Sequence, residues 1–451
     1  MPPLDAHDIE APDKDERRSA IRSALEAAKQ RYALANPQSL AAHHEATSYL
    51  PGGNTRSVLH YGPFPLLFHS GEGAVLTDAD GHRYDDFLGE FTAGLYGHSH
   101  PVILEAIENA MAQGLGFGGT NIYEVKLAAL LGERFPAVDL VRFTNSGTEA
   151  NLMALAAARV ITGRDKILVF SGSYHGGVLA FRYQMRANAP FDVIRAPYND
   201  IDETRAILRR HSSELAAVIV EPMLQSAGCI PAAPQFLDML RSETAAISAL
   251  LIFDEVVTSR LHPTGMHGAL GIKPDLVTLG KYIGGGLSFG AFGGAQSVME
   301  RFDPRQPDAI VHSGTFNNNT LSMAVAHAGL SLAYPPATAT ALNARGEELR
   351  TRLNLMSGAA GAQLQFTGIG SIMCAHMMLG PIFSAEDAAH GNADLKDLLF
   401  FHLLESGIYL AKRGMLSLSL ATTEQQINRL EDAIRRFLEI YRPLLAAPAR
   451  A

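Results

Sequence analysis

Five short apolar runs, separated by helix-forming stretches, constrain the fold of this chain more than any other sequence feature. Each run has about the length of a single β-strand, and the runs cover residues 141–144, 167–171, 217–221, 250–254 and 276–280. Strands that alternate with helices along a chain usually form a parallel sheet with helices on its faces. The sequence therefore predicts an α/β protein in which a mostly parallel sheet is covered by helices.

The length of 451 residues exceeds what one ordinary hydrophobic core accommodates, so we expect more than one structural unit. Residues 1–75 are predicted to form an N-terminal segment of helix and loop that belongs to the small domain or to a dimer contact. Residues 76–335 would form the large domain that contains the sheet. Residues 336–451 would form a smaller α+β domain.

Periodic patterns predict further elements at both ends of the chain. Residues 15–32 predict a helix with one apolar face, formed by Ile21, Leu25, Ala28 and Tyr32. In the C-terminal part, the alternating runs 364–373 and 415–420 predict half-buried strands, and residues 394–406 and 423–441 predict amphipathic helices.

Composition excludes several classes of function. The net charge of −9 argues against nucleic acid or an anionic membrane as the main partner. No window of about 18 uninterrupted apolar residues is present, and residues 1–18 are acidic and lack the apolar stretch of a signal peptide. The two cysteines, Cys229 and Cys374, stand among apolar neighbours and are expected to be core thiols rather than a disulfide framework. A reducing cytoplasm is therefore the expected compartment.

A carboxylate and an amine end two of the apolar runs. Asp254 ends the run 250–254, and Lys281 follows the run 276–280. Because the carboxyl ends of parallel strands share one edge of a sheet, the two side chains are expected to lie near each other. Each residue alone is more often structural than functional. Together, however, they suit one chemistry, because a desolvated lysine amine has a lowered pKa and attacks carbonyl groups.

The carbonyl compound that best matches this pair is pyridoxal 5′-phosphate (PLP). Its pyridine nitrogen requires an acidic partner to remain protonated, and Asp254 can be that partner. Lys281 would be the amine that reacts with the aldehyde group. Asp254 and Lys281 are therefore the candidate catalytic residues.

Two other strand ends carry groups that suit such a cofactor. Ser146, Gly147 and Thr148 lie between a predicted strand and a predicted helix, where backbone N–H groups and the helix dipole attract a phosphate. An ordinary helix N-cap is the alternative explanation. Tyr174 opens the segment after the run 167–171, and an aromatic ring there can stack on a flat cofactor.

The motifs that contain these residues resemble the class III (ω-type) aminotransferases of PLP fold type I. The matching motifs are D-E-V at Asp254, T-L-G-K-Y-I-G-G-G at Lys281, N-S-G-T-E-A-N at Ser146 and S-Y-H-G at Tyr174. The resemblance implies fold type I, with PLP as the cofactor and with its phosphate held by the segment around Ser146. It also implies that Tyr174 covers the ring, and that His175 and Glu221 belong to the surroundings of the cofactor.

One further motif of this chain resembles the family and implies a homodimer. His312-Ser313-Gly314-Thr315-Phe316 resembles the family's S-G-T-F segment, whose threonine reaches the PLP phosphate of the neighbouring subunit. Thr315 is therefore the residue expected to complete the active site of the partner. Metal is not expected, because His98 and His100 have no further ligands at suitable spacing.

Two arginines are candidates for binding the substrate. Arg56 lies in a loop rich in Pro, Gly and aromatic residues, where it either binds a carboxylate through two hydrogen bonds or is simply solvated. The stretch N-T-R-S-V-L-H-Y-G-P-F-P around it resembles the β-amino-acid branch of the family, in which this arginine receives the substrate carboxylate. His60 departs from that pattern, since relatives often have an aromatic residue there. Arg413 stands where such enzymes place a second arginine, which helps to bind the keto acid.

The resemblance implies amino transfer from a β-amino acid, aryl or alkyl and similar to β-phenylalanine, to a keto acid such as 2-oxoglutarate or pyruvate. One alternative is an aminomutase or racemase of the glutamate-1-semialdehyde aminomutase type. Related aminomutases commonly read T-G-F-R where this chain reads Thr258-Ser259-Arg260-Leu261, which argues against that alternative. Two further alternatives are transamination of amines that have no carboxylate, and a non-enzymatic regulatory domain.

Overall fold

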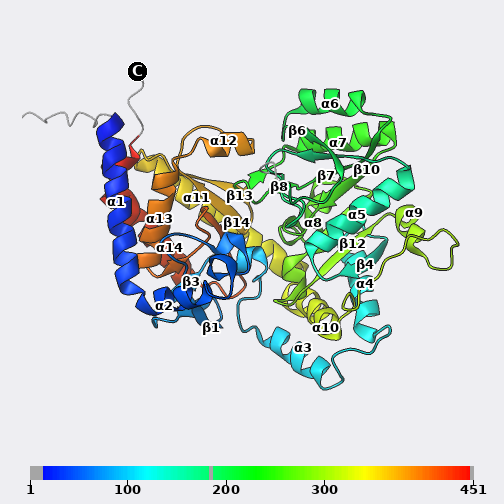
Figure 1. Ribbon diagram of the computed structural model, residues 1–451, viewed down its shortest axis with the longest axis horizontal. Helices are drawn as coiled ribbons and strands as arrows, with labels where there is room; N and C mark the ends of the chain where they lie inside the picture. The colour runs from blue at the N-terminus through cyan, green and yellow to red at the C-terminus, as the bar shows by residue number, and fades with distance from the viewer. Residues whose placement is uncertain (1–13, 182–185, 447–451) are drawn as a thin grey trace, which may run out of the picture.

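The computed structural model describes residues 14–181 and 186–446, which form two lobes that lie side by side (Figure 1). The larger lobe is built on a seven-stranded sheet of order β4-β12-β11-β10-β7-β5-β6. Six of its strands run parallel, and only β12 runs antiparallel to its two neighbours. The predicted α/β class is confirmed. The strands are β4 (Leu140–Thr144), β5 (Lys166–Phe170), β6 (Asp192–Ala196), β7 (Leu215–Val220), β10 (Leu250–Asp254), β11 (Leu276–Gly280) and β12 (Gly290–Gly294).

Four of the five apolar runs became interior strands of the sheet, whereas the run 141–144 became the edge strand β4. Every residue of β7 and of β11 is buried, as parallel strands between two layers of helices require. Helix α5 packs against β7, β11 and β12, and α7 packs against β7 and β10. The helices of this lobe are α3 (Pro101–Met111), α4 (Ile122–Arg134), α5 (Gly147–Thr162), α6 (Ile201–Arg210), α7 (Pro234–Ile247), α8 (Gly265–Leu270), α9 (Gln296–Met299) and α10 (Thr320–Ala328).

Strand β12 was not expected from the sequence, because G-A-F-G-G lacks the β-branched residues typical of strands. Its glycines are explained by close contacts. A Cβ atom on Gly290 would lie 2.2 Å from the carbonyl oxygen of Ser146, so only glycine lets the turn before α5 rest on the sheet. The edge strand β6 was not expected either.

The smaller lobe combines both ends of the chain. Helix α1 (Lys14–Ala35) packs against α13 (Ala393–Glu405), which in turn packs against α14 (Glu424–Ile440) (Figure 1). The predicted apolar face of α1 is buried, with Ile21, Leu25, Ala28 and Tyr32 each at most 4% exposed. The other elements here are α2 (Pro37–Ala46), α11 (Pro336–Ala359), α12 (Ala385–Ala389), α15 (Arg442–Leu445), β13 (Gln365–Ile369), β14 (Ile372–His376) and β16 (Met415–Ser417).

The run 364–373, predicted as one strand, is instead part of a hairpin of β13 and β14. The chain turns at Gly370, whose φ of +55° favours glycine. The prediction was wrong at this point because the apolar alternation continues through the turn.

A separate four-stranded sheet of order β1-β2-β3-β15 links distant parts of the chain. Its strands come from all three of the predicted segments, and the division at residues 75/76 and 335/336 stays a prediction. The strands are β1 (Phe68–Glu72), β2 (Val75–Asp78), β3 (Arg83–Asp86) and β15 (Ile408–Tyr409), and the short pair β8 (Met223–Leu224) and β9 (Ile230–Pro231) lies elsewhere. Within the described ranges, each helix is too short or too polar to cross a lipid bilayer.

Candidate active site

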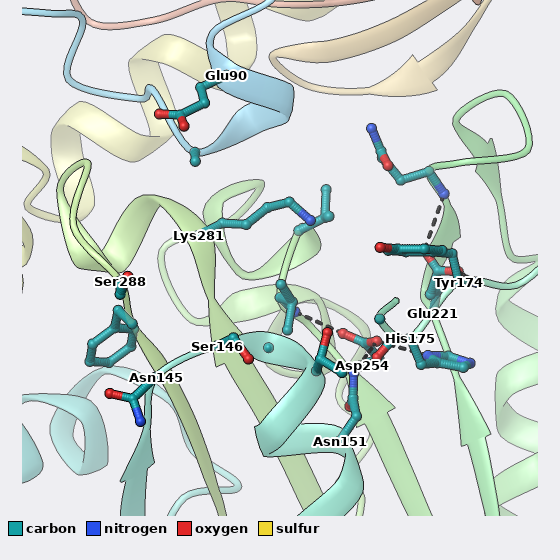
Figure 2. A pocket seen from close by; sticks show the side chains of 18 of the residues that line it. Glu90, Asn145, Ser146, Asn151, Tyr174, His175, Glu221, Asp254, Lys281 and Ser288 are labelled. Atoms are coloured by element: carbon teal, nitrogen blue, oxygen red, sulfur yellow. Dashed lines mark hydrogen bonds and ion pairs between the residues drawn. The ribbon is translucent and has the colours of Figure 1, made fainter. Parts of the chain in front are cut away.

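A cavity of about 350 Å³ opens at the carboxyl edge of the large sheet. One wall consists of residues at or just after the ends of five strands, namely Ser146, Tyr174, Glu221, Asp254 and Lys281. Figure 2 shows Glu90 entering from the opposite side, so that the side chain of Lys281 lies between Glu90 and Asp254. The sheet therefore brings together the residues that the sequence placed at its edge.

Asp254 is the most extensively hydrogen-bonded group in this cavity. Its Oδ2 accepts hydrogen bonds from Nδ2 of Asn151 at 2.8 Å and from Nδ1 of His175 at 2.8 Å. Its Oδ1 accepts one from the backbone N–H of Val256 at 3.1 Å. Asn151 is itself fixed, because its Oδ1 accepts a hydrogen bond from the Thr278 hydroxyl at 2.7 Å.

These donors keep Asp254 ionised although it is only 5% exposed. Burial acts to raise the pKa of Asp254, but the hydrogen bond and charge of His175, together with the Val256 and Asn151 donors, bring that pKa below its ordinary value. Asp254 is therefore a fixed negative charge at the bottom of the cavity.

Lys281 directly follows β11, the strand next to β10 in the sheet, in which Thr278 pairs with Asp254. Its backbone is left-handed, with a φ of +50°, which is unusual for a lysine. Burial lowers the pKa of the Lys281 amine, opposed by the charges of Asp254 and Glu221 and assisted by those of Arg413 and Arg56. A lysine in these surroundings has a larger unprotonated fraction at neutral pH than one in water, so its amine is more available as a nucleophile and proton acceptor.

The turn between β4 and α5 forms an anion cradle. The hydroxyl oxygen of Ser146 caps α5 by accepting a hydrogen bond from the N–H of Glu149 at 3.2 Å. The backbone N–H groups of Gly147 and Thr148 have no acceptor within the helix. Both residues line the cavity at the N-terminal, positive end of the helix dipole. A Cβ atom on Gly147 would lie 2.8 Å from Val256, so a larger residue would push this turn away from the sheet edge.

Tyr174, His175 and Glu221 line another part of the cavity. The ring of Tyr174 is 44% exposed and borders the cavity (Figure 2). Glu221 accepts hydrogen bonds from the backbone N–H of Tyr174 at 2.9 Å and from that of Gln225 at 3.3 Å. Burial raises the pKa of Glu221 to about 7, with the charge of Asp254 acting in the same direction and that of His175 against it.

Arg56 and Arg413, predicted from separate parts of the sequence, meet at one aromatic ring. The guanidinium carbon of Arg56 lies 5.1 Å from the ring centroid of Phe91, and that of Arg413 lies 5.4 Å from the same centroid. Thr315, by contrast, is exposed and does not line the cavity of its own chain. The binding roles proposed for these three residues stay predictions.

Three residues that the structure places at this site were not predicted from the sequence. Asn151 is the last residue of the N-S-G-T-E-A-N motif and lies one helical turn after Gly147. This spacing could have indicated that Asn151 lies on the same face of the helix as the phosphate segment. Glu90 lines the cavity, and its left-handed turn has no sequence signature beyond Gly89. Gln225 lines it as well, and its amide donates a hydrogen bond to Sδ of Met415 at 2.6 Å.

Residues Arg260 and His98 have structural partners. Arg260, in the stretch that departs from the aminomutase motif, is 1% exposed and donates hydrogen bonds to Thr92, Ser371 and Leu418. Nε2 of His98 lies 2.9 Å from Oδ2 of Asp86.

The described residues fit pyridoxal 5′-phosphate. The cradle at the start of α5 matches its phosphate, the buried ionised carboxylate of Asp254 matches its ring nitrogen, and the amine of Lys281 matches its aldehyde. Nε2 of His175 is buried and makes no hydrogen bond among the described residues, so it can still bind a group that these residues do not include. A fold of this type with this site defines a PLP-dependent transferase.

The chain belongs to the class-III aminotransferase family, whose model matches residues 58–438. It is therefore a PLP-dependent transaminase. It is 53% identical to a β-phenylalanine transaminase of Variovorax paradoxus over 421 residues, which cover 93% of this chain and 97% of the relative. The crystal structure of a β-phenylalanine aminotransferase from the same organism superposes with a TM-score of 0.94 at 52% identity, covering 95% of this chain and all of that one. A glutamate-1-semialdehyde 2,1-aminomutase of Desulforudis audaxviator is 37% identical over 410 residues, which cover 86% of this chain and 94% of the relative.

Proposed function

We propose that this enzyme moves the amino group of a β-amino acid, with an aryl or alkyl group on the amine-bearing carbon, to a keto acid such as 2-oxoglutarate or pyruvate. The observation that carries the proposal is the convergence of Arg56 and Arg413 on Phe91, close enough for both charges to affect Lys281. Two guanidinium groups beside a reacting amine suit carboxylate-bearing substrates. The 53% identical β-phenylalanine transaminase supports this assignment.

The residues of this chain would have the following roles in the reaction. When bound, PLP supplies the carbonyl group that takes up the amine and the conjugated ring that spreads the resulting negative charge. Lys281 would move the proton from the amine-bearing carbon of the substrate to the carbon that was the aldehyde carbon of the cofactor, because its amine is desolvated by burial. Asp254 would stay ionised and hold a proton on the ring nitrogen. Arg56 would hold the donor carboxylate, and Arg413 would help to hold that of the keto acid.

A single half-reaction tests the proposal. The PLP-loaded protein is mixed with each enantiomer of 3-amino-3-phenylpropanoate without a keto acid, and the cofactor absorbance is followed together with ketone formation. Conversion by one enantiomer supports the proposal and gives the handedness. Conversion only by 1-phenylethylamine or by an α-amino acid refutes the β-amino acid as substrate. Absence of ketone with every amine would favour the aminomutase alternative instead.

We also propose a homodimer in which Thr315 reaches the partner's phosphate site. Thr315 is exposed and is not among the described residues that line the cavity of its own chain, which supports this arrangement. Dilution to a monomer should then release PLP together with activity, and a monomer that retains PLP would contradict the arrangement. The buried, unpaired thiols Cys229 and Cys374 agree with the cytoplasmic location that the sequence suggested.

A further inference from the structure

The turn that contains Glu90 has an unusual backbone. Four successive residues are left-handed, with φ values of +52° at Gly89, +47° at Glu90, +54° at Phe91 and +80° at Thr92. Three of them carry side chains, for which this conformation is unfavourable. Such strain persists only where the surroundings impose it, and it is concentrated at functional positions.

Buried groups on both sides hold this turn in place. Oδ1 of Asp86 accepts hydrogen bonds from the N–H groups of Leu88 at 2.8 Å and of Gly89 at 3.0 Å. At the other end, Nη1 of the buried Arg260 donates a hydrogen bond to the carbonyl oxygen of Thr92 at 3.1 Å. The turn is therefore a fixed part of the fold, and the direction of the Phe91 side chain is fixed with it.

The ring of Phe91 is what this turn presents to the two arginines. Both guanidinium carbons lie within 5.4 Å of its centroid, a distance at which the negative face of an aromatic ring attracts a cation. The carboxylate of Glu90, next in the chain, lies 4.0 Å from Nη1 of Arg56. Two like charges that repel each other are thus held near one point by a ring and a neighbouring carboxylate.

We propose that Phe91 is a positioning residue that holds the guanidinium groups of Arg56 and Arg413 where substrate carboxylates bind, and that it therefore acts in both half-reactions. This inference rests on the proposed function and adds to it. Without the ring, both arginines lose a partner that fixes their direction, so donor and acceptor carboxylates should both bind more weakly. Substrates without a carboxylate should be affected much less.

A purely structural role for Phe91 would give a different result. The ring is partly buried and packs against a cluster that contains Leu88 and Met415. Loss of packing alone would weaken the enzyme for all substrates, whereas loss of the arginine contacts would weaken it selectively for carboxylates.

The test compares Phe91→Leu and Phe91→Tyr with wild type in both half-reactions, with PLP-loaded enzyme for the donors and pyridoxamine-phosphate-loaded enzyme for the acceptors. The donors are 3-amino-3-phenylpropanoate and 1-phenylethylamine, and the acceptors are pyruvate and acetophenone. For Phe91→Leu we expect half-saturating concentrations that rise about 5- to 20-fold for 3-amino-3-phenylpropanoate and for pyruvate, and less than about twofold for the other two compounds. Phe91→Tyr keeps the ring and should stay within about twofold of wild type.

A second variant separates the cation contact from the shape of the side chain. Replacement of Phe91 by pentafluorophenylalanine keeps the ring but removes the negative charge of its faces, so it should reproduce the carboxylate-selective effect even if Phe91→Leu does not fold. Unchanged carboxylate binding in this variant, equal losses for all four compounds, or an effect in one half-reaction only would overturn the inference. A wild-type enzyme that does not prefer the acid over 1-phenylethylamine would refute the proposed function itself, before any variant is compared.

Discussion

Replacement of Glu221 by glutamine should make the stability of the protein less dependent on pH. Glu221 is 5% exposed, and burial raises its pKa from an ordinary value of 4.5 to about 7. Its two oxygens accept the backbone hydrogen bonds of Tyr174 and Gln225, so the carboxyl group stays in place while it titrates. Glutamine has nearly the same shape and no charge, so the variant removes the titration with little change in packing.

The sign of the effect follows from the protons bound in each state. Between pH 4.5 and 7 the folded protein holds a proton on Glu221 that the unfolded chain has released, so stability falls as pH rises through this range. A pKa difference of this size corresponds to about 3 kcal/mol in total, of which about 2.5 kcal/mol is lost between about pH 5 and pH 8. Glu221→Gln should lack this part of the loss.

The assay is urea unfolding of the cofactor-free protein at pH 5 and at pH 8. The difference in unfolding free energy between the two pH values should be about 2–3 kcal/mol smaller in Glu221→Gln than in wild type. Glu108→Gln, on the exposed face of α3, is the matched control and should follow wild type. If the pH dependence of Glu221→Gln equals that of wild type, Glu221 is ionised in the folded protein and the burial argument is wrong.

Three further substitutions test the site. Lys281→Ala should lower both half-reactions about 10³-fold or more, because Lys281 is the only lysine that lines the cavity among the described residues, and normal turnover would exclude its proposed role. Asn151→Ala removes one hydrogen-bond donor from Asp254 and should destabilise its ionised form by about 1.5–3 kcal/mol. The pKa of Asp254 should therefore rise, and the acid limb of the pH–rate profile should move to higher pH. An unchanged acid limb would contradict this role of Asn151. Arg56→Ala should weaken the binding of 3-amino-3-phenylpropanoate about 10- to 100-fold and leave the binding of 1-phenylethylamine nearly unchanged, as measured by the half-saturating concentration in the donor half-reaction. Equal losses would exclude the anchoring role.

The large sheet could be predicted because its signal is local. Strand-length apolar runs bounded by polar groups indicate buried strands, and the carboxyl ends of parallel strands share an edge, so Asp254 and Lys281 could be placed together from spacing alone. Strand β12 could not, because its glycines are required by the contact between Gly290 and Ser146, which exists only in the folded protein.

The substrate side of the site was less accessible to sequence reasoning. Arg56 and Arg413 were selected by resemblance, but nothing local indicates that two residues 357 positions apart both reach Phe91. The left-handed turn is likewise hidden, because Glu90-Phe91-Thr92 has none of the Gly, Asn or Asp residues that usually mark such a backbone. Arg260 was noticed only as a departure from a motif, whereas its hydrogen bond to Thr92 depends on tertiary structure.

The origin of the two sets of residues has a consequence for how such proteins diversify. Ser146, Tyr174, Glu221, Asp254 and Lys281 all lie at or just after the ends of strands of one sheet, whereas Arg56, Phe91 and Arg413 come from segments outside it. With the roles proposed for these residues, mutations in the outer segments would alter which amine or keto acid is accepted without moving the groups at the edge of the sheet. New substrate ranges can arise in this architecture by a few changes in loops, while the rigid sheet keeps the type of chemistry constant.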